Sequence, residues 1–265
     1  MPGQADAKPY SADRSIVGKL RRRLARAVMR KPAHLDTRRP LLTISFDDAP
    51  ASAADTGAAI LARHGILGTY FISAGLMGRD SHLGTFARVD EVKKLHAAGH
   101  EIACHTYSHL DCGRASAADI AGNIEQNQRV LKHMCIPQPV TFAYPYGDVS
   151  PQAKKLLNGQ YLAARALHPG VIVSGVDLNQ APAVGIEGVD GEDNAVAWLE
   201  RAARVRAWLV LYTHDVREHP SDWGCTPDAL ERIIAKALSL GFETVTFAEG
   251  ARRAQGVEDT HAHAA

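Results

Sequence analysis

Short apolar runs alternate with longer amphipathic segments from residue 41 to residue 247. The short runs have the length and flanking residues of buried strands, and they predict strands over 41–46, 68–73, 101–104, 140–143, 161–164, 207–212 and 242–247. Between them, longer segments predict helices over 52–64, 89–98, 116–134, 150–158, 192–206 and 227–239. Gly99 is suited to end the second of these helices, and Ser116 with Asp119 is suited to begin the third.

This alternation predicts parallel strands joined by helical crossovers, which fits both a barrel and an open sheet. The chemistry favours a barrel, because the polar residues of interest follow the carboxyl ends of predicted strands, where barrel active sites are built. At 265 residues the chain can hold one large α/β domain. We expect a basic arm and linker over 1–39, the barrel over 40–253 and a tail over 254–265.

Two motifs carry most of the candidate chemistry. Asp47 and Asp48 end the first apolar run, and adjacent side chains leaving a strand point in different directions. His105 and His109 are four residues apart, and we expect them on one face of a helical turn, where both imidazoles reach one metal ion. The position after the first histidine holds Thr106 instead of glutamate, which disfavours the HExxH class of peptidases.

Together these side chains supply the parts of a metal-assisted hydrolase. Asp48, His105 and His109 would bind Zn²⁺ or another divalent transition metal and leave a coordination position open. Asp47 would be the general base, and His214, which follows the predicted strand 207–212, would be the general acid.

The segment 142–147 adds aromatic residues after another predicted strand. We expect the backbone N–H of Tyr146 to donate to a developing oxyanion, and its ring to form, with Pro145, a wall for a sugar. Taken singly, each of these signals is also typical of a solvated turn, an aromatic turn or a capping histidine.

In combination, the motifs resemble those of the NodB-type polysaccharide deacetylases, carbohydrate esterase family 4. Ser45–Asp48 resembles the first family motif, His105–His109 the second, Phe142–Gly147 the third and Leu211–His214 the fifth, in family order. The resemblance implies a distorted (β/α)7 barrel, a zinc-like divalent metal and hydrolysis of N-acetyl groups of N-acetylglucosamine, less often of O-acetyl groups.

By the same resemblance, Asp47 is the base, His214 the acid, and Asp48, His105 and His109 are the metal ligands. The chain also departs from the family pattern. Ala143 stands where the third motif often has an arginine that pairs with the base, and Arg165, after the next predicted strand, is a candidate replacement.

The fourth family motif, of the Asp-x-x-Asp-Trp type, is not evident, and Asp177 in the corresponding region matches it poorly. Family members with an Ala-Tyr-Pro-Tyr third motif resemble this chain better, and many of them act on exopolysaccharide N-acetylglucosamine. The holdfast deacetylases of stalked bacteria are similar in size and apparent location, which suggests such a role.

Charge is distributed unevenly. Residues 1–40 carry a net charge of +8 and the remainder about −7. Over 15–30, apolar residues recur at helical spacing while basic residues occupy most of the other face. Two interpretations stay open: a helix that lies on an anionic membrane surface, or a helix packed on the domain with its arginines in water. Nucleic acid is not an expected partner, because the body is acidic and no platform of aromatic and basic residues follows.

We expect a cytoplasmic protein, peripheral at the inner membrane, because the sequence shows no signal peptide and no apolar run long enough to span a membrane. The four cysteines have no CxxC spacing and are expected to be free thiols.

The predicted function is metal-dependent N-deacetylation of N-acetylglucosamine in an exopolysaccharide or its lipid-linked precursor. An O-acetyl esterase or a deacetylase of peptidoglycan or chitin oligomers would use the same site. A non-catalytic glycan-binding member of a polysaccharide synthesis complex is the alternative from another class.

Overall fold

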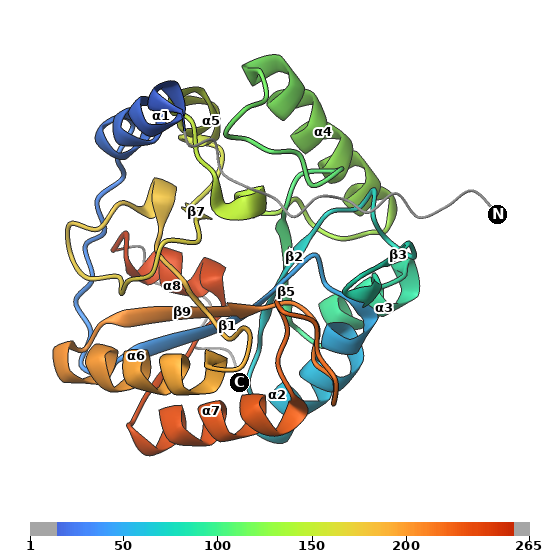
Figure 1. Cartoon of the computed structure of the whole chain (residues 1–265), viewed down its shortest axis with the longest axis vertical. Coiled ribbons are helices and arrows are strands. Elements are labelled where there is room, and N and C mark those ends of the chain that lie inside the picture. Colours follow the sequence, from blue (N-terminus) through green and yellow to red (C-terminus); the bar gives the residue numbers. More distant parts are fainter. Residues whose placement is uncertain (1–14, 257–265) are drawn as a thin grey trace.

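The computed structural model of the chain describes residues 15–256. Its centre is a curled parallel sheet, in which the strands lie in the order β7-β6-β5-β2-β1-β9-β8 (Figure 1). The bounds of these strands are β1 Leu41–Asp47, β2 Thr69–Ile72, β5 Glu101–Cys104, β6 Thr141–Ala143, β7 Ala163–Arg165, β8 Val184–Gly185 and β9 Trp208–Thr213. The short strand β10 (Glu243–Thr244) pairs with the first two residues of β1, on the side where β2 pairs with its last three.

The two edges of the sheet approach each other through residues 181–185. Ala181 bridges to Arg165 of β7, and β8 then pairs with β9. The sheet therefore curls into an incomplete barrel, and the carboxyl ends of its parallel strands meet at one mouth.

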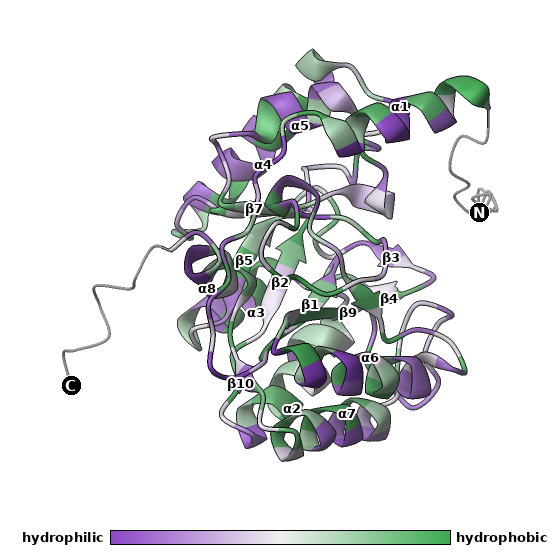
Figure 2. Cartoon of the chain, turned by 90° about the vertical axis from the view of Figure 1, so that its left-hand side faces the viewer, coloured by the Kyte–Doolittle hydropathy of each residue, from purple (hydrophilic) through white to green (hydrophobic). Residues whose placement is uncertain are grey.

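Helices surround the sheet. They are α1 Ile16–Ala27, α2 Ala58–Arg63, α3 Val89–Ala97, α4 Ala117–His133, α5 Pro151–Leu157, α6 Gly191–Val205, α7 Pro227–Ser239 and α8 Phe247–Arg253, with a π-helical turn over Ala53–Gly57 before α2. A small antiparallel pair, β3 (Asp80–Ser81) and β4 (Gly84–Thr85), lies outside the sheet. Figure 2 shows α6 and α7 as helices with separate polar and apolar sides, as expected when one side packs on the sheet.

Side chains alternate between two apolar clusters along each strand. In β1, Leu42, Ile44 and Phe46 pack between the sheet and its helices, whereas Leu41 faces the barrel interior with Trp208 and other residues. Because the period of a strand is two, Asp47 shares the interior face of Leu41. This alternation explains why a carboxylate at the end of an apolar strand is buried inside the barrel mouth.

The predicted fold class is confirmed, and most predicted strands lie within two residues of the observed ones. The strand predicted over 242–247 is wrong in its second half. Only Glu243–Thr244 pair with β1, and Thr246 then caps α8 by accepting from the backbone N–H of Glu249. A threonine followed three residues later by glutamate is a helix start, and this local preference prevails over the apolar run.

Part of the predicted domain division lies outside the described residues, namely 1–14 of the arm and 257–265 of the tail. Within 15–39, α1 packs beside α5 (Figure 1). No helix between residues 15 and 256 is long and apolar enough to cross a membrane.

Candidate metal centre and active site

The metal-ligand candidates converge at the barrel mouth. Asp48, His105 and His109 each offer one ligand atom, and these atoms all lie within 4.8 Å of one another. Oδ1 of Asp48 is 4.0 Å from Nε2 of His105, and Oδ2 is 3.8 Å from Nε2 of His109. One carboxylate and two imidazole nitrogens are a donor set that suits zinc and related divalent metals.

Backbone conformation turns Asp48 toward the histidines. Asp48 has a φ of +58°, in the left-handed region that only a few per cent of non-glycine residues adopt. Asp47, still in β1, keeps the strand direction and points elsewhere. The different directions expected for the two carboxylates therefore arise where the backbone turns left-handed, at Asp48 and Ala49 directly after the strand, a kind of strain that concentrates at functional sites.

The histidine motif is not a helical turn, contrary to the sequence expectation. His105 follows β5, and Thr106 and His109 have φ angles of +61° and +56°, which no α-helix contains. Asn123 of α4 fixes the intervening turn, because its Oδ1 accepts hydrogen bonds from the backbone N–H groups of Tyr107 and Ser108. The two imidazoles meet through this turn, with ring centroids 4.9 Å apart.

Hydrogen bonding prepares His105 to be a ligand. Its Nδ1–H donates a hydrogen bond to the carbonyl oxygen of Ala143 at 2.8 Å, which leaves the lone pair on Nε2, the nitrogen that faces Asp48. Burial lowers the pKa of His105 and of His109 to about 4, so both imidazoles are neutral at pH 7, as metal ligands must be.

The residues present fit a divalent metal. Oδ1 of Asp48 is buried and has no hydrogen-bond partner among the residues that the structure describes. Burial also raises the pKa of Asp48, since the charged form lacks a compensating cation. An orphaned carboxylate oxygen facing two neutral imidazoles is the arrangement that a bound cation completes.

Arg165 binds the candidate base. Its Nη2 lies 2.5 Å and 2.6 Å from the two carboxylate oxygens of Asp47. The guanidinium is fully buried between the rings of Phe71 and Tyr212, at 4.9 Å and 5.0 Å from their centroids. Burial raises the pKa of Asp47, but the charge and hydrogen bonds of Arg165, together with the contributions of His105 and His214, outweigh burial, so the pKa lies below its ordinary value.

The position of Arg165 agrees with its expected role as the replacement for the arginine missing at Ala143. Its side chain is enclosed and reaches the base, so it does not line the substrate space. The small side chains of Ala143 and Ala163 face the same interior and leave room for the guanidinium. The cation thus comes from β7, one strand beyond the position where the resemblance would place it.

His214 lies after β9, beside the same space. The positive charge of His214 would lower the pKa of both Asp47 and Asp48. Its Nδ1 is 3.2 Å from the carbonyl oxygen of Trp223 and 3.7 Å from a carboxylate oxygen of Glu187. Burial raises the pKa of Glu187 to about 6. Glu187 comes just after β8 and is a site residue that sequence reasoning missed.

Tyr146 lies beside the ligands as predicted for a wall residue. Its φ is +59°, its ring centroid is 4.3 Å from that of His109, and its side chain is 40% exposed. Pro145 is buried beneath it and opens the short 3₁₀ turn Pro145–Gly147. Tyr146 thus faces the mouth, whereas Pro145 supports the turn.

Asp177 takes no part in this site. Its Oδ1 accepts hydrogen bonds from the backbone N–H groups of Lys31 and Asn179, and its other carboxylate oxygen pairs with Lys154, which is fully buried. The weak match to a fourth motif therefore marks an anchor for the segment after α1.

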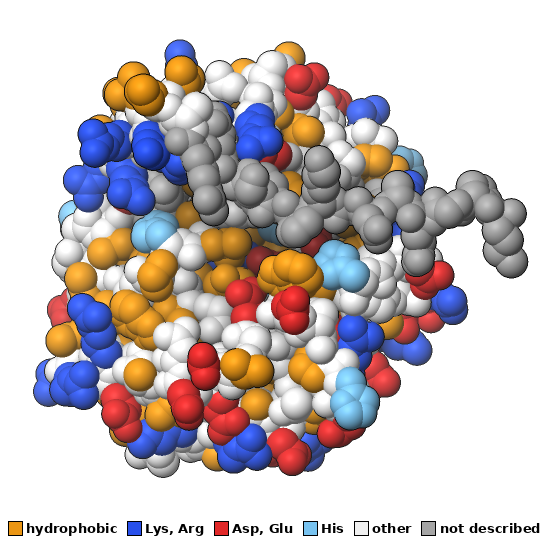
Figure 3. Space-filling view, viewed as in Figure 1, with side chains coloured by type: hydrophobic (Ala, Val, Ile, Leu, Met, Phe, Trp, Pro, Cys, Tyr) orange, Lys and Arg blue, Asp and Glu red, His pale blue; other side chains and the backbone are white. Residues whose placement is uncertain are grey.

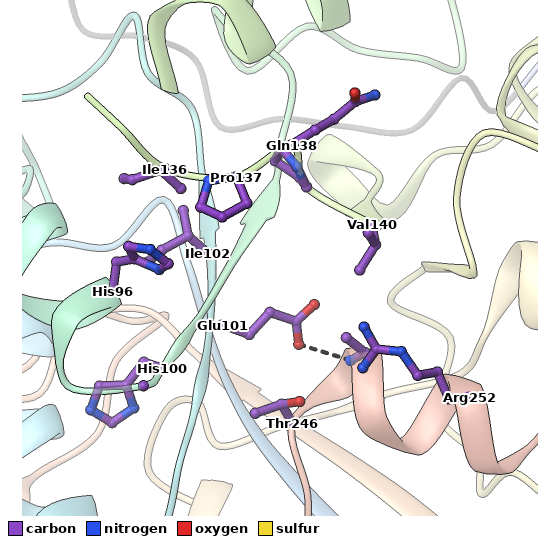
Figure 4. A pocket seen from close by; sticks show the side chains of 13 residues that line it. His96, His100, Glu101, Ile102, Ile136, Pro137, Gln138, Val140, Thr246 and Arg252 are labelled. Atoms are coloured by element: carbon purple, nitrogen blue, oxygen red, sulfur yellow. Dashed lines mark hydrogen bonds between the residues drawn. The ribbon is translucent and has the colours of Figure 1, made fainter. Parts of the chain in front are cut away.

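A hollow of about 330 Å³ lies away from the site, near the amino ends of β5 and β6 (Figure 4). His96, His100 and Arg252 line it together with Glu101. The Glu101 carboxylate already accepts hydrogen bonds from Thr69, Thr141 and the backbone of α8. Glu101 therefore links β2, β6 and α8 at the amino ends of the strands. The candidate catalytic and metal-binding residues lie at the opposite end, after the carboxyl ends of the strands.

Comparison with known proteins agrees with this geometry. The family model described as polysaccharide deacetylase matches residues 34–162, which include Asp47, Asp48, His105, His109 and Tyr146. This part of the chain, just under half of it, is therefore similar to the polysaccharide deacetylase family. Arg165, Glu187 and His214 lie beyond the matched residues, and the structure alone brings them to the site.

Curated relatives match over less than half of the chain. A chitin deacetylase from Pestalotiopsis sp. is 26% identical over 44% of this chain and 37% of its own length. A peptidoglycan-N-acetylglucosamine deacetylase from Listeria monocytogenes is 25% identical over 42% of this chain and 22% of its own length. The matched part thus spans well under half of these relatives.

Solved structures show the same fold. A putative polysaccharide deacetylase from Mycobacterium smegmatis superposes with a TM-score of 0.65 at 16% identity, covering 85% of this chain and 93% of that one. The chitin deacetylase from Colletotrichum lindemuthianum gives a TM-score of 0.56 at 19% identity, over 82% and 89%. A family pseudoenzyme from Bacillus anthracis gives 0.55 at 14% identity, over 82% and 66%.

Proposed function

We propose that this protein is a metal-dependent N-deacetylase that hydrolyses the N-acetyl groups of N-acetylglucosamine residues in an exopolysaccharide or its lipid-linked precursor. The observation that carries the proposal is the pairing of Asp47 with Arg165 directly beside the cluster of Asp48, His105 and His109. A metal site alone needs no ionised, unligated carboxylate, whereas a hydrolase needs one as a base.

Each group has a defined task. Asp48, His105 and His109 would hold a divalent metal, which when bound would polarise the acetyl carbonyl and make water more acidic. Asp47 removes a proton from the attacking water as its oxygen bonds to the acetyl carbon. His214 donates a proton to the sugar nitrogen as the C–N bond breaks. The products are acetate and a free amine on the sugar.

Relatives support the substrate class. The matched relatives are named as deacetylases of chitin and of peptidoglycan N-acetylglucosamine, both polymers that contain N-acetylated glucosamine. The exposed ring of Tyr146 beside His109 offers an apolar wall for one sugar face. A holdfast polymer and a cytoplasmic, membrane-peripheral location stay predictions from the sequence.

The test measures acetate and free amine released from N-acetylglucosamine oligomers by metal-stripped protein, before and after Zn²⁺ is restored. Asp48→Ala and Asp47→Asn separate metal binding from catalysis, since only the first removes a ligand. Metal-dependent release of both products, lost in both variants, is the expected result.

Other outcomes decide against the proposal. Acetate without amine, on acetate esters only, identifies an O-acetyl esterase. Metal binding and glycan binding without release from oligomers or from lipid-linked substrate identify a non-catalytic glycan-binding protein. A family pseudoenzyme from Bacillus anthracis is among the structural relatives.

A further inference from the structure

Helix α1 presents its apolar side to solvent. The side of α1 that faces the barrel carries the buried small residues Gly18 and Ala25, together with Arg21, which pairs with Asp148. The large apolar side chains lie on the opposite side and are exposed, Ile16 by 84%, Val17 by 72%, Leu20 by 55% and Leu24 by 48%. A helix on the surface of a soluble domain normally does the reverse and buries its large apolar residues. We call these four residues the apolar stripe.

Basic side chains flank the stripe. Lys19, Arg23 and Arg26 are exposed along one side of α1, and the helix contains no acidic residue. None of the three forms an ion pair with any residue between 15 and 256. Figure 3 shows Lys and Arg side chains gathered over α1, next to hydrophobic ones. Of the two interpretations that the sequence left open, α1 does pack on the domain, but its large apolar side chains stay outside that contact.

The helix is held in this orientation. Arg21 pairs with Asp148 at 2.9 Å, and the buried Lys154 donates to the carbonyl oxygen of Ala25 at 2.7 Å. After the helix, Lys31 donates to the carbonyl oxygens of Tyr161 and Leu162. Turning the stripe inward would break these contacts and leave Lys154 short of an acceptor, which is costly for a buried charge.

We infer that α1 docks on an anionic lipid bilayer, with the apolar stripe among the headgroups and acyl-chain ends and the basic flank against lipid phosphates. A 12-residue helix with one apolar side, a cationic flank and no acidic residue has the pattern of an interfacial helix. Charge complementarity favours an anionic bilayer as the surface that α1 binds. A second copy of the chain would bring two cationic flanks together, whereas an anionic bilayer neutralises them.

The docked helix would bring the active site to the lipid surface. Arg21 of α1 binds Asp148, which lies two residues after Tyr146, and the Tyr146 ring contacts the ligand His109. The biological role of this docking rests on the proposed function: a deacetylase held at the lipid surface would act on the acetylated sugar of a lipid-linked oligosaccharide. Membrane binding itself is measured without any reaction.

The experiment is a flotation assay of the purified full chain with lipid vesicles at low and high salt. One set of vesicles contains phosphatidylcholine alone, and the other contains about 30% phosphatidylglycerol as the anionic lipid. Leu20→Gln with Leu24→Gln removes half of the stripe, and Lys19→Gln with Arg23→Gln removes part of the flank. Val205→Gln with Leu238→Gln is the matched control, since both residues are exposed apolar side chains on other helices. Activity on a soluble oligomer is followed in parallel.

We expect binding to anionic vesicles only, weakened at least tenfold by high salt and by either α1 pair, with the control pair unchanged. Absence of binding at low salt overturns the inference, as does binding that both α1 variants retain. A dimer in solution that the Leu20 and Leu24 changes dissociate would overturn it in favour of a second copy. Since α1 variants should keep their activity on the soluble oligomer, an inactive wild type would instead count against the proposed function.

Discussion

Arg165 at the end of β7 holds Asp47 at the end of β1, with its Nη2 within 2.6 Å of both carboxylate oxygens. The two residues are 118 positions apart in the chain and meet because alternate residues of both strands face the barrel interior. The pair keeps the base ionised in a buried place, where a lone carboxylate would take up a proton.

Replacing Arg165 by methionine should damage the base without removing the metal ligands. The pKa of Asp47 should rise, because burial then acts without an opposing cation. We expect kcat/KM at pH 7 to fall on the order of a hundredfold and the acidic limb of its pH profile to move upward. Profiles measured with metal content held equal test this, and a variant with wild-type activity and an unshifted limb would contradict it.

The same pair should govern stability at low pH. The pKa of folded Asp47 is depressed, so its contribution to the free energy of unfolding is present above the unfolded pKa of about 3.9 and is lost as pH falls through the folded value. Arg165→Met should cost about 3–5 kcal/mol near pH 7 by leaving the carboxylate unpaired. Adding Asp47→Asn should restore most of that loss but no activity. Urea unfolding of the wild type, the single variant and the double variant, at pH 7 and at low pH, measures these stability effects. Equal losses in the single and double variants would refute the pairing.

Metal removal should lower the melting temperature. A metal at a hundred times its Kd contributes about 2.7 kcal/mol, which corresponds to roughly 5–10 °C for a domain of this size. Asp48→Asn should abolish the Zn²⁺-dependent rise, because Asp48 supplies one of the three ligand atoms. Asp47→Asn should retain the rise although it is inactive. A thermal scan with and without Zn²⁺ distinguishes them, and equal responses in the two variants would mean that the ligand assignment fails.

Glu187 should act through His214. Its carboxylate lies 3.7 Å from Nδ1 of His214 and holds the imidazole in place. Because the pKa of Glu187 is about 6, its carboxylate is ionised at neutral pH, and this contact weakens as pH falls below that value. In wild type we therefore expect kcat to fall as pH falls through about 6, and Glu187→Gln should remove this part of the pH profile and lower kcat at pH 7 by about tenfold.

Glu192→Gln is the matched control for Glu187, since Glu192 pairs with Arg232 at the surface. If both glutamine variants share one pH profile, Glu187 does not position the acid. If Glu187→Asp keeps the wild-type dependence of kcat on pH while Glu187→Gln does not, the charge of the side chain at position 187, and not its packing, is responsible.

Residues next to regular strands could be predicted from the sequence. The positions of Asp47, Asp48, His105 and His214 follow from apolar runs whose ends are clear, because parallel strands bring those ends together. Arg165 was identifiable for the same reason, as the residue after a predicted strand. Its exact partner required knowing that the strand ends one residue later and that the interior faces align.

Irregular segments could not be predicted in this way. Glu187 follows a two-residue strand in a stretch without periodicity, so nothing local ties it to His214. The left-handed turn at 105–109 depends on Asn123, which belongs to a helix that begins eight residues after the motif. A signal for Asn123 existed, since Asn123 and Asn127 are four residues apart on α4, and both bind backbone at the site edge of the sheet.

Asp177 should be needed for folding and not for chemistry. Its carboxylate neutralises the buried Lys154 and accepts from the backbone of Lys31, so Asp177→Ala should cost about 3–5 kcal/mol in the free energy of unfolding. Replacing Lys154 by methionine in addition should recover much of that loss, because no uncompensated charge then stays buried. The folded variants should deacetylate a soluble oligomer with kcat/KM within about twofold of wild type, since no contact joins Asp177 to the ligands or to the base. Urea unfolding together with kinetics at a temperature where all variants are folded tests this. A hundredfold loss of kcat without loss of stability would instead make Asp177 part of the catalytic site and restore it as the fourth motif.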